Sequence, residues 1–77
     1  MPFFNPTGVV LLDVILRRDG LVKRWTINTG DLPDYWSCRL LDANSVTVSA
    51  CFTEAAVTAR VREWEAQIDA ARADGWA

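Results

Sequence analysis

Histidine is absent from this 77-residue chain, and cysteine occurs only twice, at Cys38 and Cys51. Without histidine the chain cannot build the Ser-His or Cys-His pairs of common hydrolases, and it offers no imidazole to a metal. Two cysteines are too few for a structural zinc site, and their spacing differs from the CxxC of thioredoxin-type redox sites. We therefore expect no enzymatic activity and no cofactor.

Long hydrophobic stretches and a strong positive charge are also missing. The longest uninterrupted apolar run is Val9–Leu12, whereas a membrane span needs about 18 residues or more. The first residues lack the basic region and apolar core of a secretory signal. The net charge of −2 argues against direct nucleic-acid binding, which requires a basic stripe. The sequence predicts a cytoplasmic protein that binds neither membranes nor nucleic acids.

The length allows one domain, which we expect to span residues 1–77. Two prolines, an asparagine and a glycine in residues 1–8 predict an irregular N-terminal arm. Residues 9–18 and 21–28 alternate between apolar and polar side chains on either side of Asp19-Gly20, the strongest hairpin signal in the chain. These two segments are therefore predicted to form antiparallel strands, with Val10, Leu12, Val14 and Leu16 of the first on the core face.

The segment 32–43 has two interpretations. Trp36, Cys38 and Leu40 alternate with polar neighbours, which favours a strand over residues 35–42. Alternatively, Asp31 is placed to cap a helix through the same segment. We prefer the strand and retain the helix as the alternative.

A further strand is predicted over residues 46–52, where alternation is cleanest. Its expected core face carries Val46, Val48, Ala50 and Phe52. A three-residue turn at 43–45, with Asn44 left-handed, places Cys38 opposite Ala50 and Cys51 opposite Ser37. The two thiols would then lie on opposite faces of the sheet, and no disulfide is expected between them.

Residues 53–75 carry the signals of one helix. Thr53 is a suitable N-cap, Gly75 is placed to end the helix, and apolar residues recur at helical spacing from Val57 to Ala71. The predicted fold class is α+β: a single three- to four-stranded antiparallel meander over residues 9–52, with one C-terminal helix packed on one face. Trp25, Trp36 and Trp64 are expected to meet in the core.

A single helix covers only one face of such a sheet. The other face would carry an apolar set consisting of Val9, Leu11, Ile15 and Val22. This is more apolar surface than a solvated sheet face usually shows. Either Phe3 and Phe4 of the arm fold over it, or it binds a protein partner, or a one-residue error has exchanged the faces.

Charge is segregated along the chain. Residues 1–30 have a balance of +2 and residues 31–77 a balance of −4. Six carboxylates of the loop and helix form a candidate acidic partner-binding surface: Asp31, Asp34, Glu54, Glu63, Glu65 and Asp69. A solvated helix with i,i+3 pairs such as Arg62–Glu65 explains the same charges. Glu65 and Asp69 lie off the apolar stripe, so we expect them to be solvated rather than catalytic.

Small size, an acidic balance, one sheet with one helix and no catalytic set are the features by which the whole chain resembles the anti-CRISPR proteins of phages and mobile elements. The resemblance implies a non-enzymatic inhibitor of a type I CRISPR-Cas system. It implies the cytoplasm of a bacterial host as the location and a Cas effector subunit as the partner, bound through an acidic surface that competes with DNA. The alternative is a small interaction module that binds a protein through the apolar sheet face. In either case a monomer is expected rather than a homodimer.

Overall fold

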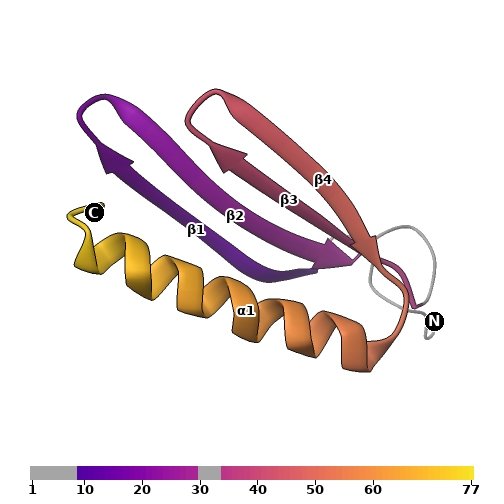
Figure 1. The fold of residues 1–77 in the computed structure, drawn as a ribbon. Helices are drawn as coiled ribbons and strands as arrows, with labels where there is room; N and C mark the ends of the chain where they lie inside the picture. Colours follow the sequence, from indigo (N-terminus) through magenta and orange to yellow (C-terminus); the bar gives the residue numbers. More distant parts are fainter. Residues whose placement is uncertain (1–8, 30–33) are drawn as a thin grey trace.

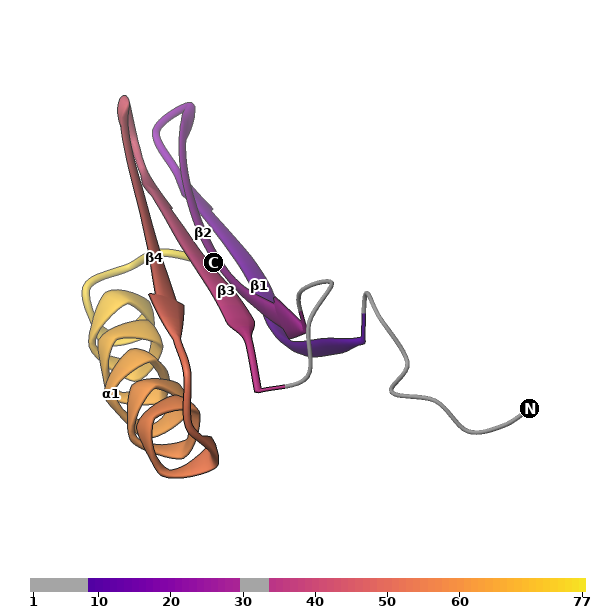
Figure 2. The ribbon, with the colours of Figure 1, turned by 90° about the vertical axis from the view of Figure 1, so that its right-hand side faces the viewer.

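The computed structural model describes residues 9–29 and 34–77, which form one antiparallel sheet with one helix across it (Figure 1). The strands follow one another as a meander in the order β1-β2-β3-β4. Their bounds are Val10–Arg18 for β1, Leu21–Thr29 for β2, Trp36–Asp42 for β3 and Ser45–Cys51 for β4, and the helix α1 covers Glu54–Ala73. Figure 2 shows the helix on one side of the sheet only, so the predicted α+β architecture is confirmed. The predicted arm of residues 1–8 lies outside the described residues.

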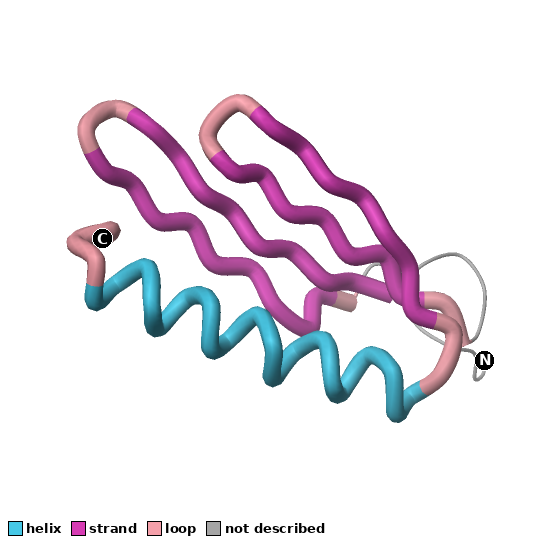
Figure 3. The backbone as a smooth tube through the Cα atoms, viewed as in Figure 1, coloured by secondary structure: helices cyan, strands magenta, loops and turns pink. Residues whose placement is uncertain are grey.

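The segment with two interpretations forms a strand (Figure 3). Cys38 is fully buried under α1, and Trp36 and Leu40 pack against the same core. These are the three alternating side chains on which the prediction of a strand depended. The helix alternative is therefore wrong for residues 36–42.

The turn between β3 and β4 is shorter than predicted. Asp42 lies opposite Ser45, so only Ala43 and Asn44 form the turn. The left-handed residue is Ala43, with φ of 56°, and not Asn44 as predicted. A left-handed alanine carries steric strain because its Cβ crowds the following carbonyl oxygen.

Removing one residue from the turn exchanges the two faces of β4. Cys51 is buried in the core, whereas Val46 and Val48, predicted to be buried, are each 60% exposed. Phe52, also predicted inward, is 66% exposed and lies against Tyr35 with a ring separation of 5.7 Å. The predicted core face of β4 is therefore wrong, and its apolar side chains lie on the far side of the sheet from α1.

A register shift between Val10 and Leu12 interrupts the alternation at the start of β1. Beyond it, Leu16 is buried, and Leu12 and Val14 pack against the core as predicted. Val10, predicted on the same face, is 55% exposed instead. A bulge of this kind re-aims the side chains that precede it.

The helix begins where the sequence indicates. The Thr53 hydroxyl accepts a hydrogen bond from the Ala56 N–H at 3.0 Å, which satisfies one of the free donors of the first turn. Trp64 is buried in the core with Trp25, while Trp36 is only partly buried at its margin.

The chain beyond the helix folds back onto β1. Gly75, with φ of 99°, ends the helix, and the Trp76 N–H donates to the Ala71 carbonyl at 3.0 Å, as in a Schellman motif. The Trp76 ring is buried, and Lys23 Nζ lies 4.6 Å from its centroid. Ala77 then exchanges two backbone hydrogen bonds with Arg17. Trp76 thus belongs to the core, although its place after the helix-ending Gly75 gives no sequence signal for it.

Candidate functional site

The sheet face opposite α1 is covered by none of the described residues (Figure 2). We call it the open face. By strand register it carries the side chains of Val10, Asp13, Ile15, Arg17, Val22, Arg24, Thr26, Asn28, Ser37, Arg39, Leu41, Val46, Val48 and Ala50. Three arginines and one aspartate give this face a balance of +2, against −2 for the whole chain. Charge is therefore divided between the open face and the rest of the molecule.

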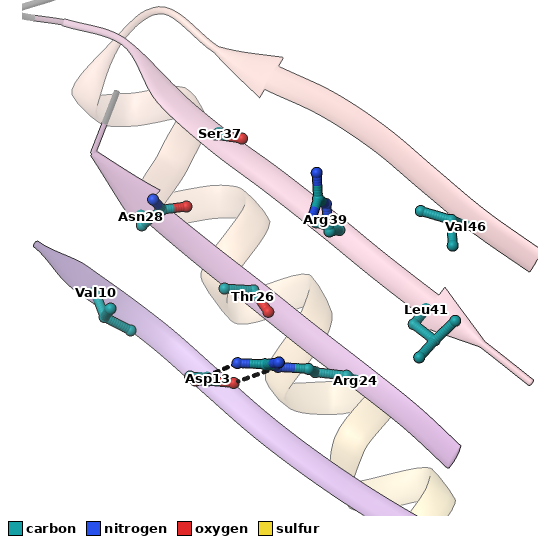
Figure 4. A pocket seen from close by; sticks show the side chains of 9 residues that line it. All are labelled: Val10, Asp13, Arg24, Thr26, Asn28, Ser37, Arg39, Leu41 and Val46. Carbon is teal, nitrogen blue, oxygen red and sulfur yellow. Dashed lines mark hydrogen bonds and ion pairs between the residues drawn. The ribbon is translucent and has the colours of Figure 1, made fainter. Parts of the chain in front are cut away.

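A shallow hollow of about 540 Å³ lies in the middle of the open face and reaches all four strands (Figure 4). Its lining residues are Val10, Asp13, Arg24, Thr26, Asn28, Ser37, Arg39, Leu41 and Val46. Polar and charged side chains occupy its centre, and valines lie at both ends (Figure 4). This mixture is typical of a surface that recognises a polar ligand with apolar flanks.

Asp13 and Arg24 form a two-bond ion pair across β1 and β2. Arg24 Nε donates to Asp13 Oδ1 at 3.0 Å, and Arg24 Nη2 donates to Asp13 Oδ2 at 2.9 Å. These hydrogen bonds lower the pKa of Asp13 and raise the pKa of Arg24. Because each side chain satisfies the other, neither supplies a free charge to a ligand.

Arg39 is different. It lies on β3 opposite Thr26 of β2 and Val48 of β4, and its side chain is exposed. Among residues 9–29 and 34–77 it forms no ion pair or side-chain hydrogen bond. A guanidinium presents a planar fork of donors that matches a carboxylate. Arg39 is therefore the free cation of the hollow.

The predicted apolar face is only partly the observed one. Ile15 and Val22 lie on the open face, with Ile15 exposed and Val22 half-buried. Val9 and Leu11 are exposed beside the bulge at the start of β1. The proposed cover by Phe3 and Phe4 involves residues outside the described ranges, so it stays a prediction.

The carboxylates of the predicted acidic surface are distributed over two flanks of α1. Glu65 and Asp69 line a hollow beside Leu12 and Val14 of β1. Glu63 faces the other way, where it pairs at 3.4 Å with Arg60. The same Arg60 donates to Ser49 Oγ of β4 at 2.7 Å. The structure thus brings Glu65 and Asp69 together and separates them from Glu63.

The remaining acidic candidates lie at the loop end of the molecule. Glu54 is exposed in the first turn of α1, and Asp34 is exposed just before β3 with a left-handed φ of 55°. Asp31 lies outside the described residues. The predicted pair Arg62–Glu65 is not among the ion pairs of the described residues, in which Arg60–Glu63 takes the i,i+3 role.

The two thiols lie together in the core, so the prediction of opposite faces is wrong. Cys38 Sγ is 3.8 Å from Cys51 Sγ, and both are free thiols. Burial raises the pKa of Cys38 to about 11, and the hydrogen bond with Cys51 adds to the effect. At neutral pH Cys38 is protonated, and a protonated buried thiol is a poor nucleophile.

Comparison with protein families, with curated proteins and with solved structures found no match to this chain. Within residues 9–29 and 34–77, no group of three or more Cys, Asp or Glu side chains is placed to hold a metal ion. Over the same described ranges, no helix is both long and apolar enough to cross a membrane.

Alternation in residues 35–42 puts Arg39 on the face opposite Cys38, but the sequence does not single it out as a binding residue. Val46 and Val48 are predicted to be buried, because alternation identifies the two faces of a strand without saying which of them is inward. The available signal was the choice between a two-residue and a three-residue turn after Asp42. A strand with Thr47, Ser49 and Cys51 inward follows from the shorter turn.

Proposed function

We propose that this chain is a non-enzymatic interaction module that binds an acidic segment of a protein partner on its open face. The observation that carries the proposal is Arg39, a guanidinium without an ionic partner among the described residues, in the hollow of an uncovered sheet face. A bound carboxylate would receive two parallel hydrogen bonds from it.

The surroundings of Arg39 fit the same ligand. Thr26, Asn28 and Ser37 offer hydroxyl and amide groups to a peptide backbone, and Leu41 and Val46 offer apolar contact at one end of the hollow. The remainder of the chain has a balance of −4. An acidic partner is therefore repelled elsewhere and directed to the open face, an effect that salt screens.

A random peptide library presented to the immobilised protein tests the proposal. We expect enrichment of peptides that combine Asp or Glu with apolar residues, and binding that weakens as salt increases. Arg39→Glu should reduce their binding by about tenfold or more, since a like charge now faces the ligand. Arg62→Glu is the matched control, because Arg62 is an exposed arginine on α1. Equal binding by the Arg39 variant, or loss in the Arg62 variant, contradicts the proposal.

An inhibitor of the anti-CRISPR type, acting on a Cas effector subunit through an acidic surface, is the second candidate. The feature in its favour is the exposed pair Glu65 and Asp69 on one flank of α1. Arg72 lines the same hollow and reduces its negative charge. Reversal of both carboxylates to lysine should abolish inhibition of an effector complex in this case, while Arg39→Glu should leave it intact.

A further inference from the structure

The sheet has two edges, and among residues 9–29 and 34–77 only the β1 edge bonds to a further segment, at Arg17. On β1, the Arg17 N–H donates to the Ala77 carbonyl at 2.8 Å, and the Ala77 N–H donates to the Arg17 carbonyl at 3.0 Å. On β4, no backbone hydrogen bond of the described residues leads to any element other than β3. An edge with unpaired peptide groups is a template for another strand.

Strand register shows which peptide groups of β4 are free. In a two-residue hairpin the pair that flanks the turn is hydrogen-bonded, and the next pair along is not. In β1–β2 this rule makes the backbone N–H and C=O groups of Arg17 and Val22 point away from each other. The structure agrees: Arg17 bonds to Ala77, and the Val22 carbonyl accepts from the Ala43 N–H at 2.9 Å.

The β3–β4 hairpin also has a two-residue turn, so the same rule applies to it. The peptide groups of Val46, Val48 and Ala50 then point away from β3, into the free edge. The same three residues direct their side chains to the open face. Residues 45–48 of β4 are exposed on both faces of the sheet, since Thr47 on the helix side is exposed as well.

The amino-acid composition of the two edge strands also indicates that β4 is the edge open to pairing. Native proteins protect free edges with charges, prolines, bulges or covering segments. β1 contains Asp13, Arg17 and Arg18 and has a register shift near its start. β4 contains no charged residue, no proline and no glycine over its seven residues. Among the described residues, β4 therefore has no charge, proline, bulge or covering segment that would prevent pairing.

The β4 edge is complementary to itself. In an antiparallel pair of two β4 strands centred on Val48, Val48 lies opposite its own copy and Val46 lies opposite Ala50. All of these residues use their outward peptide groups, and their apolar side chains meet on one face. On the other face Thr47 lies opposite Ser49, which suits hydroxyl hydrogen bonding. No charged side chain from either strand enters the contact.

We infer that β4 is a strand-pairing site whose occupant is a second copy of this chain, which pairs antiparallel about Val48 to form one continuous sheet. The two-fold axis is perpendicular to the sheet, so both helices lie on one side and both open faces on the other. This inference replaces the monomer expected from the sequence. It depends on backbone groups of β4 and not on Arg39, so it is independent of the proposed function.

Sedimentation equilibrium over a concentration series tests the pairing. We expect a monomer–dimer equilibrium in the wild type. Val48→Lys should weaken the dimer by about tenfold or more, because two like charges would face each other at the axis. Val10→Lys is the matched control, being an exposed valine of the β1 edge strand, and should leave the dimer unchanged. Circular dichroism shows whether each variant is folded.

A second measurement tests the register. Val48→Cys should give a disulfide-linked dimer under mild oxidation, because opposed residues of a hydrogen-bonded pair have Cα atoms about 5.5 Å apart. Thr47→Cys should not, since its opposite residue is Ser49. A monomer at every concentration overturns the inference, as does a dimer that survives Val48→Lys. Strand pairing only with a foreign protein appears as a monomer and overturns it equally.

Discussion

The two hairpins of the sheet differ in the residues of their turns and in the hydrogen bonds of their outer edges. The β1–β2 hairpin turns through Asp19 and Gly20, both at positive φ, and its edge is tied to Ala77 by two backbone hydrogen bonds, next to the buried Trp76. The β3–β4 hairpin turns through a left-handed Ala43, and its edge strand β4 forms no backbone hydrogen bond with any described segment beyond β3. The first hairpin has a glycine in its turn and charges along its edge strand, whereas the second has a strained alanine in its turn and no charge along its edge strand.

Such a difference between two parts of one small sheet indicates a division of roles. A chain of this size has only about 3–5 kcal/mol of stability from its core. A free edge and a strained turn reduce that margin, and they are located together in the β3–β4 hairpin. In the proposals above, Arg39, Val46 and Val48 of β3 and β4 contact the partners, while the β1 edge is tied to Ala77.

The largest expected effect concerns the tie on the β1 side. Trp76 is 9% exposed, and its ring lies beneath Lys23. Trp76→Ala removes a buried aromatic ring and should cost about 3–5 kcal/mol in the free energy of unfolding. That is enough to unfold most of the protein, as urea denaturation followed by circular dichroism would show.

Phe52→Ala is the matched truncation on the β4 side. Phe52 is 66% exposed, so its loss should change the free energy of unfolding by less than about 0.5 kcal/mol. Comparable losses in the two variants would show that both sides of the sheet are tied down alike, and would remove the contrast between them.

A medium effect is expected at the two turns, where opposite substitutions exchange their residue types. Gly20→Ala places a Cβ at φ of 80° with no neighbouring atom within 4 Å, so its cost of about 1–2 kcal/mol comes from the backbone alone. Ala43→Gly relieves strain at φ of 56° and should stabilise by about 0.5–1 kcal/mol. Thermal melts of the two variants should therefore shift in opposite directions. A loss of stability in Ala43→Gly would show that the second turn is unstrained.

The same contrast explains what the sequence could and could not predict. Asp19-Gly20 predicts its hairpin directly, because both residues tolerate positive φ. The stripe from Val57 to Ala71 and the cap at Thr53 likewise predict α1. Ala43 gives no such signal, because alanine rarely adopts a left-handed conformation. The sequence therefore predicts a turn after Asp42 that is one residue too long, and with it the burial of the exposed valines of β4.

The residues of the proposed binding surface are predictable only in part. Arg39 follows from alternation in β3, but its lack of an ionic partner depends on where Asp13 lies, and Asp13 pairs with Arg24 instead. The register of β1 against β2 decides that Asp13 pairs with Arg24. Segregation of charge along the sequence therefore indicated an acidic helix, while the three-dimensional arrangement separates the carboxylates of Glu63 and Glu65.

At neutral pH the last effect is the smallest, because it appears only in alkali, in the β3–β4 half of the sheet that holds the thiols. Burial raises the pKa of Cys38 to about 11 from a reference value of 9.0. Between these values the unfolded chain loses a thiol proton that the folded chain keeps. The free energy of unfolding should therefore fall as the pH rises from 9 toward 11. Urea denaturation at a series of pH values measures this slope, and Cys38→Ala, which retains the other titrating groups, should show a shallower one. Equal slopes in the two proteins would show that Cys38 ionises as easily in the fold as in the unfolded chain, and that the β3–β4 half is more open to water than the structure indicates.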